Sequence, residues 1–162
     1  MKSRRKAREA ALQALYQCDS LGDWSADQIG LFLSEFVEME EDSSDLSKRN
    51  LEFARALMLG VIERIDLVDG HISLASSHWS LPRMSRVDRN ILRLATYEIL
   101  FCNDIPPSVA INEAIEIAKR YGTEDSPMFI NGVLDHIAVA LAANPEMVND
   151  VQLLRPKKAV NQ

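Results

Sequence analysis

The sequence contains few cysteines and no long apolar run, and each shortage argues against a class of protein. Its two cysteines, Cys18 and Cys102, lie far apart, which favours a reducing compartment with both as small core residues. The longest unbroken apolar run, residues 137–143, is far too short to cross a bilayer. The first residues also lack the apolar segment of a signal peptide. We therefore expect a cytoplasmic protein with no membrane partner.

Motifs for catalysis and for metal or cofactor binding are missing as well. His71, His78 and His136 show no zinc-ligand spacing, and the two cysteines do not form a CxxC pair. The sequence has no P-loop and no glycine-rich dinucleotide fingerprint. We therefore predict that the protein is not an enzyme and has no catalytic residues, no metal site and no cofactor.

The pattern that is present is helical. Apolar residues repeat with a period of 3.6 almost everywhere and with a period of two almost nowhere. The chain has 162 residues, of which 47% are apolar, and this is enough for a real core. We predict an all-α fold of about seven helices in two small bundles that pack as one compact unit.

Capping residues and helix breakers mark where these helices begin and end. Ser3, Ser25, Ser85 and Ser126 are suited to N-caps, and Pro107 suits a first helical turn. The expected helices are 3–19, one from residue 25, a long one from about residue 46, one from residue 66 or 69, one from residue 85, 107–121 and 126–143. Gly122 is expected at the C′ position of the helix that starts at Pro107.

The connecting segments suggest how the chain is divided. The acidic stretch "EMEEDSSD" is expected to be a solvated link, and "SLPRMS" is the candidate midpoint between two halves. We therefore expect one domain over 1–143, with subdomains of about 1–80 and 81–143, and a loose tail over 144–162.

A block of five cations, Lys2, Arg4, Arg5, Lys6 and Arg8, opens a chain whose net charge is −6, so the other residues together carry −11. The apolar stripe of the first helix, followed backwards from Leu15 through Ala11, meets Arg8 and then Arg4. Burying unpaired guanidinium groups is very costly, so we expect the core to end near Ala11 and the first turns to project beyond it. A projecting basic helix end suits phosphate binding, and a solvated terminus is the alternative.

Charged residues in the second half raise similar alternatives. Glu98 falls on the apolar face of its helix, where a buried carboxylate needs hydrogen bonds or a cation, and we interpret it as a structural anchor. Arg86, Arg89 and Arg93 form a stripe roughly opposite that face. This stripe is a second RNA patch, a protein contact or a solvated surface, the last being slightly favoured.

Two aromatic residues and one glycine are further candidates. Phe129 can stack on an unpaired base or fill the core beside Ile130, and the sequence favours neither. Tyr16 is better interpreted as a core residue than as a stacking platform. Gly132 lies inside a predicted helix, where close helix packing or the approach of an RNA backbone would explain it.

Three motifs, "RRKAREAALQALYQ", "VDRNILRLATYEIL" and "DIPPSVAINEAIEIAKRYGTEDSPMFINGVLD", resemble the NusB family of bacterial transcription antitermination factors. The resemblance extends from Lys2 to Ala142. It implies an all-α fold of two helical subdomains and a non-enzymatic role. It also implies binding to the boxA element of ribosomal RNA transcripts together with NusE, a small-subunit ribosomal protein, within an antitermination complex on RNA polymerase.

The same resemblance implies roles for individual residues. The arm of RNA-binding cations corresponds to Lys2, Arg4, Arg5, Lys6 and Arg8. The motif "EDSPMFINGVLD" adds Asp125, Phe129 and Asn131 to the RNA surface, although Met128 stands where the family often has a basic residue. The region around Asp88, with Arg86 and Arg89, resembles the part of the family that meets NusE.

Two other functions are compatible with the sequence. One is a purely protein-binding helical adaptor with an incidental basic arm, and the other is a module related to the N-terminal domains of ribosomal RNA methyltransferases. The sequence leaves open whether the protein is a monomer or a homodimer.

Overall fold

The computed structural model describes residues 2–39 and 48–149. Within these residues it contains seven α-helices, two short 3-10 helices and no strand. The α-helices are α1 (Lys2–Leu21), α2 (Ala26–Met39), α3 (Lys48–Glu63), α4 (Ile65–Ala75), α5 (Arg86–Phe101), α6 (Pro107–Tyr121) and α7 (Ser126–Ala143). The 3-10 helices are η1 (Leu81–Arg83) and η2 (Pro145–Asn149). The all-α prediction is confirmed.

Two of the serines predicted as N-caps accept hydrogen bonds from backbone N–H groups at the helix starts. The Ser85 hydroxyl accepts a hydrogen bond from the backbone N–H of Asp88 (3.1 Å), and Ser25 accepts one from Gln28 (3.4 Å). Helix α6 begins at Pro107, as predicted, and Gly122 is its C-cap rather than the residue beyond the cap. Gly122 has an extended backbone, and a side chain there would collide with Ser126.

Ser126 differs from its predicted role as an N-cap, because it is the first residue of α7 itself. Its hydroxyl accepts a hydrogen bond from the backbone N–H of Thr123 (2.9 Å) and donates one to Asp88 (2.7 Å). The residue therefore ties the start of α7 to the start of α5 instead of capping its own helix.

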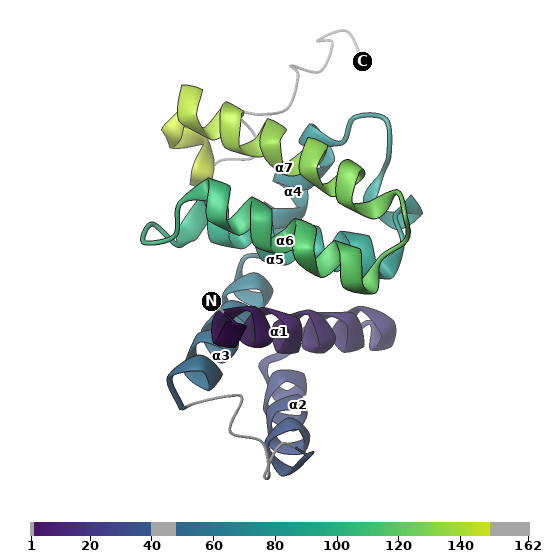
Figure 1. The fold of residues 1–162 in the computed structure, drawn as a ribbon, viewed down its shortest axis with the longest axis vertical. Coiled ribbons are helices and arrows are strands. Elements are labelled where there is room, and N and C mark those ends of the chain that lie inside the picture. Colours follow the sequence, from purple (N-terminus) through teal and green to yellow (C-terminus); the bar gives the residue numbers. More distant parts are fainter. Residues whose placement is uncertain (1, 40–47, 150–162) are drawn as a thin grey trace, which may run out of the picture.

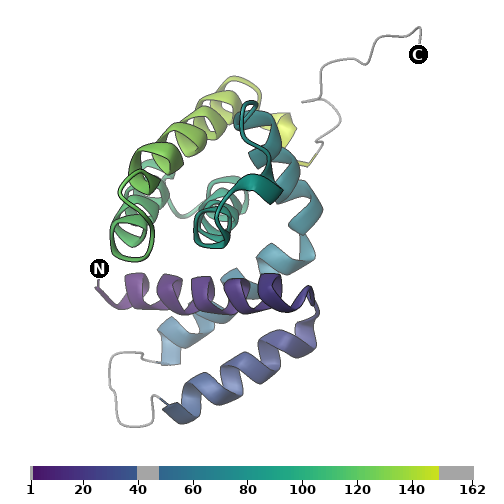
Figure 2. The ribbon, with the colours of Figure 1, turned by 90° about the vertical axis from the view of Figure 1, so that its right-hand side faces the viewer.

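The helices enclose two apolar cores that meet along α5. One core lies among α1, α2 and α3 and contains Leu15, Met58 and Leu94, the last from α5. The other is formed by α4 to α7, and Leu12 of α1 belongs to it. Figures 1 and 2 show α1 lying across the lower side of the α5–α6 pair. Helix α2 lies on the other side of α1, farther from that pair. The two bundles are therefore packed as one body, with α1 and α5 at their junction.

The boundary between the bundles differs from the predicted one. Val68 and Ile72 of α4 are fully buried in the second core, so α4 packs with α5 and α7 although the sequence placed it in the first half. The chain turns between α3 and α4 at Arg64, slightly earlier than the expected break at residue 66 or 69. The first core is thus built mainly from residues before this turn, with Leu94 of α5 added from beyond it.

Helix α7 and the following residues complete the second bundle. By length and mean hydropathy α7 could cross a bilayer, a test that core helices of soluble proteins also pass. Its Ile130, Leu134 and Ile137 are buried in the core. Residues 145–149, predicted to be part of a loose tail, form η2. The remaining tail residues and most of the acidic link fall outside the described residues.

Candidate nucleic-acid interface

The basic N-terminal block lies in the first turns of α1, and its members have different surroundings. Lys6 is exposed, whereas the Arg4 guanidinium lies over the ring of Phe53, 4.6 Å from its centroid. Lys2 is part of α1, but its side chain is outside the described residues. The arm is therefore helical from its start and rests on α3 at one side.

Arg5 is a half-exposed cation paired with an acid of α6. Its Nε lies 2.6 Å from Glu113 Oε2 and its Nη2 lies 3.3 Å from Oε1, and 41% of its side-chain surface is exposed. Burial acts to raise the pKa of Glu113, but the hydrogen bonds and the charge of Arg5 outweigh this and hold that pKa below its ordinary value. Among the described residues, Arg5 Nη1 has no hydrogen-bond partner and is available to a ligand.

Arg8 corrects the prediction that the first turns project beyond the core. Its side chain is only 3% exposed, and Nε and Nη2 donate three hydrogen bonds of 2.7–3.1 Å to Glu98. Ala7 is also fully buried, so the core continues past Ala11. The prediction assumed that this guanidinium has no partner, whereas it is paired with Glu98. Because it is buried, a phosphate at the surface cannot reach it.

Glu98 is buried, as predicted, and Arg8 is its cation. Only 1% of its side-chain surface is exposed. Burial raises the pKa of Glu98, and the hydrogen bonds from Arg8 oppose this rise. Glu98 therefore acts as a structural anchor that holds α1 against α5.

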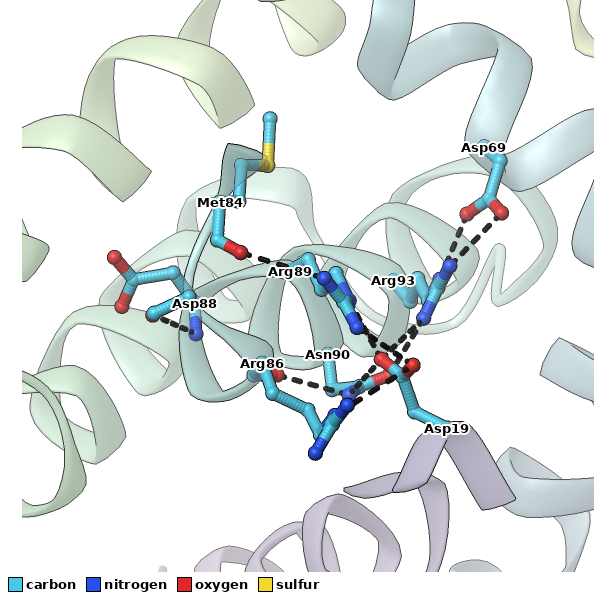
Figure 3. A network of polar contacts seen from close by, with 9 residues as sticks. Asp19, Asp69, Met84, Arg86, Asp88, Arg89, Asn90 and Arg93 are labelled. Atoms are coloured by element: carbon cyan, nitrogen blue, oxygen red, sulfur yellow. Dashed lines mark hydrogen bonds and ion pairs between the residues drawn. The ribbon is translucent and has the colours of Figure 1, made fainter. Parts of the chain in front are cut away.

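The arginines of α5 form ion pairs with acidic residues of α1 and α4 instead of a solvated stripe (Figure 3). Arg89 donates to both oxygens of Asp19, at 2.6 and 2.7 Å. Arg93 donates to Asp19 at 3.0 Å and to Asp69 at 2.8 and 3.1 Å. Arg86 is the exposed member, 3.8 Å from Asp19 with 41% of its side chain in solvent.

The start of α7 brings its predicted site residues near the start of α5. Asp125 and Asn131 are exposed, and Phe129 is half-buried against the second core. Ser126 joins Asp88 directly, as described above. Phe129 therefore packs against the core and is partly exposed to solvent. Gly132 is exposed and a Cβ there would meet nothing within 4 Å, so close helix packing does not explain it.

Tyr16, predicted to be a core residue, is 41% exposed. It lies at the edge of the apolar stripe of α1, and the Arg86 guanidinium is 5.7 Å from the centre of its ring. The phenol is therefore partly exposed to solvent beside Arg86, the first residue of α5.

Three residues at the contact between α1 and α6 were not predicted from the sequence. Glu9 is buried, and its carboxylate accepts hydrogen bonds from Arg120 (3.1 Å) and from the Tyr121 hydroxyl (2.5 Å). Both partners lie at the end of α6 and are exposed. Their contact with Glu9 depends on tertiary packing, and no spacing in the sequence signals it.

Groups suited to catalysis or metal binding are not gathered in the part of the chain that the structure describes. No cluster of three or more histidine, cysteine or acidic side chains there could hold a metal ion. Both cysteines are free, and burial raises the pKa of Cys102 to about 11, which makes a poor nucleophile. Burial also lowers the pKa of His71, whose Nε2 has no partner among the described residues.

Cations gathered on the surface at one helix end, as at the start of α1, are typical of a nucleic-acid-binding protein. The NusB family model matches residues 5–139. The transcription antitermination protein NusB of Geotalea daltonii is 48% identical over 143 residues, covering 87% of this chain and 97% of the relative. That of Desulfitobacterium hafniense (strain Y51) is 45% identical over 148 residues, covering 91% and 96%.

Solved structures agree with these relatives. T. maritima NusB has a TM-score of 0.72 at 46% identity, covering 84% of this chain and 90% of that one. A complex of the antitermination factors NusB and NusE with double-stranded RNA has a TM-score of 0.72 at 31% identity, covering 86% and 98%. The chain belongs to the NusB family, which is a family of transcription antitermination factors and not of enzymes.

Proposed function

We propose that this protein is a cytoplasmic transcription antitermination factor that binds boxA-type single-stranded RNA of ribosomal RNA transcripts together with NusE, within an antitermination complex on RNA polymerase. The observation that carries the proposal is membership of the NusB family over residues 5–139, together with the cations exposed at the start of α1. A related NusB was solved with NusE and RNA.

The arm contributes phosphate contacts through Arg4, Arg5 and Lys6, with Lys2 at its start. Arg5 is well suited because Glu113 fixes its guanidinium through Nε and Nη2 and leaves Nη1 for a phosphate oxygen. Arg8 is removed from the proposed contacts, since its charge is buried against Glu98. Its role is to hold the helix from which the other cations extend.

The start of α7 contributes base contacts. Phe129 offers a partly exposed aromatic ring, and the exposed Asp125 and Asn131 offer polar groups that can reach base edges. Met128 is 82% exposed and carries no charge, so this end of the surface depends less on phosphate attraction than the arm does.

The start of α5 is the proposed contact for NusE. Arg86 is exposed there, and Asp88 lies next to it on the first turn of α5. Arg89, the next residue of α5, joins this helix start to α1 through its two hydrogen bonds to Asp19. A protein partner at this corner would lie close to RNA on α7, because Ser126 connects the two helix starts.

The test is a titration of the full chain with labelled boxA-like single-stranded RNA, with and without NusE, against a scrambled RNA of the same composition. We expect preference for the boxA-like RNA and tighter binding when NusE is present. Binding to NusE with no preference between the two RNAs would favour the protein-binding adaptor instead.

A further inference from the structure

A groove of about 490 Å³ runs along the exposed face of α1, between the end of α6 and α2. Figure 1 shows α1 between these two helices. The lining side chains that matter here are Lys6, Gln13 and Gln17 of α1, Phe36 of α2, and Arg120 and Tyr121 of α6. The groove begins at the basic arm, because Lys6 belongs to both.

Aromatic rings stand on both sides of the groove. Phe36 is half-buried and stacks on Phe32 with 5.7 Å between ring centroids and 20° between planes. Tyr121 faces it from α6 and is 36% exposed. Single-stranded RNA is commonly held by such rings, on which bases stack, together with amide groups that bond base edges. Gln13 is exposed and Gln17 is partly exposed in the groove, and both supply amides of this kind.

The two sides of the groove carry exposed charges of opposite sign. Lys6 and Arg120 lie on the side of the arm and α6, and Arg120 is 61% exposed. Glu9 beneath them is buried and already bonded to Arg120 and Tyr121, so it fixes their positions. On the α2 side the exposed charge is Glu35. A nucleotide strand would therefore place its phosphates along Lys6 and Arg120 and direct its bases toward Phe36.

We propose that this groove binds the single-stranded RNA segment that continues from the basic arm, as a base-binding subsite formed by Tyr121, Phe36 and the two glutamines. The inference rests on the proposed function, since it extends the RNA path along α1. The arm supplies the charge that attracts the strand, and the groove supplies stacking surfaces and amides next to it.

The test compares RNA affinities of two groove variants with a matched control. Gln13→Glu places a negative charge in the groove at an exposed position, and we expect affinity to fall about five-fold or more. Phe36→Leu keeps an apolar side chain but removes the stacking face, and we expect a loss of about five- to ten-fold. Ser34→Glu adds the same charge to the opposite face of α2 and should change affinity less than two-fold, with thermal melting checked for all three.

A second readout locates the RNA directly. Ultraviolet cross-linking of the full chain to boxA-like RNA, followed by mass spectrometry, should give cross-linked peptides from α2 that disappear with Phe36→Leu. If wild-type RNA binding is intact, yet Gln13→Glu binds as Ser34→Glu does and α2 is not cross-linked, the groove inference is overturned and the proposed function stands. If Gln13→Glu lost NusE binding while its RNA binding was unchanged, the groove would be a peptide-binding site. That result would also overturn the inference that the groove binds RNA. A wild-type chain that binds no RNA would overturn the proposed function itself.

Discussion

Arg8 of α1 and Glu98 of α5 form an ion pair inside the protein, with Nη2 and Oε1 2.7 Å apart and less than 4% of either side chain exposed. The two residues are separated by 90 positions in the sequence. The pair joins the helix that carries the basic arm to the central helix of the second bundle. The position of the arm on the surface therefore depends on a contact made in the core.

Removing one member of this pair should destabilise the protein strongly. In Glu98→Ala the buried guanidinium of Arg8 loses its counter-charge, and we expect the free energy of unfolding to fall by about 3–5 kcal/mol. Urea unfolding followed by far-UV circular dichroism measures this change. The double variant Arg8→Met with Glu98→Leu should recover much of the loss, because neither buried charge remains. A single variant as stable as the parent would contradict the buried pair.

Asp19 should make stability depend on pH in the acid range. Burial acts to raise the pKa of Asp19, but hydrogen bonds from Arg89 and Asn90 and the nearby Arg93 outweigh it and hold that pKa below its ordinary value. A lowered carboxyl pKa stabilises the folded state above the unfolded pKa of about 3.9, and this stabilisation is lost as the pH falls through the folded value.

Asp19→Asn should therefore be less stable than the parent at pH 7, by about 2 kcal/mol or more. The difference between the two proteins should shrink as the pH is lowered from about 5 toward 2, because the parent carboxylate becomes protonated. Urea midpoints at four or five pH values measure it. A difference that stays constant over this range would show that Asp19 is not titrating with a lowered pKa.

Gly60 and Tyr97 make a close contact between α3 and α5. A Cβ at position 60 would overlap the ring of Tyr97, which packs against both cores. We expect Gly60→Ala to lower the free energy of unfolding by about 1–3 kcal/mol. The matched control is Gly30→Ala in α2, where nothing lies within 4 Å of the new Cβ. There the better helix propensity of alanine should raise stability by up to about 1 kcal/mol, and equal effects at the two sites would argue against the contact.

The helices were predictable because their signals are local. Caps such as Ser85 and the first-turn proline at 107 act within one turn, and apolar periodicity within a helix requires no knowledge of its neighbours. The burial of Glu98 followed from the same periodicity. What periodicity does not contain is which helix faces which.

The errors share that cause. The sequence indicated a stripe reaching Arg8 and a carboxylate buried at Glu98, yet it did not show that these two charges are partners. The prediction that the core ends near Ala11 is therefore wrong. In the same way Arg89 and Arg93 of α5 pair with Asp19 of α1, 70 or more positions away, and Arg93 also pairs with Asp69 of α4, 24 positions away. Tertiary pairing, which a single sequence does not reveal, decided each of these positions.

The last prediction separates phosphate contact from folding within the arm. Arg4 and Lys6 are not ion-paired with any described residue, whereas Arg8 is buried, so the two groups should respond differently to mutation. The double variant Arg4→Ala with Lys6→Ala should melt close to the parent, apart from a small loss where Arg4 covers Phe53. Its RNA affinity should fall, and the slope of log K against log[salt] should flatten by about 1.4, at about 0.7 for each single-strand phosphate contact.

Arg8→Ala serves as the contrasting variant. It should melt far below the parent, and any RNA binding it loses should return at temperatures where it is fully folded, because Arg8 anchors the helix rather than touching phosphate. The measurement pairs RNA titrations at four salt concentrations with thermal melts of the same preparations. If the double variant kept the parent slope, Arg4 and Lys6 would make no phosphate contacts. If Arg8→Ala instead melted normally and lost the salt dependence, its guanidinium would have to reach RNA, against its burial beside Glu98.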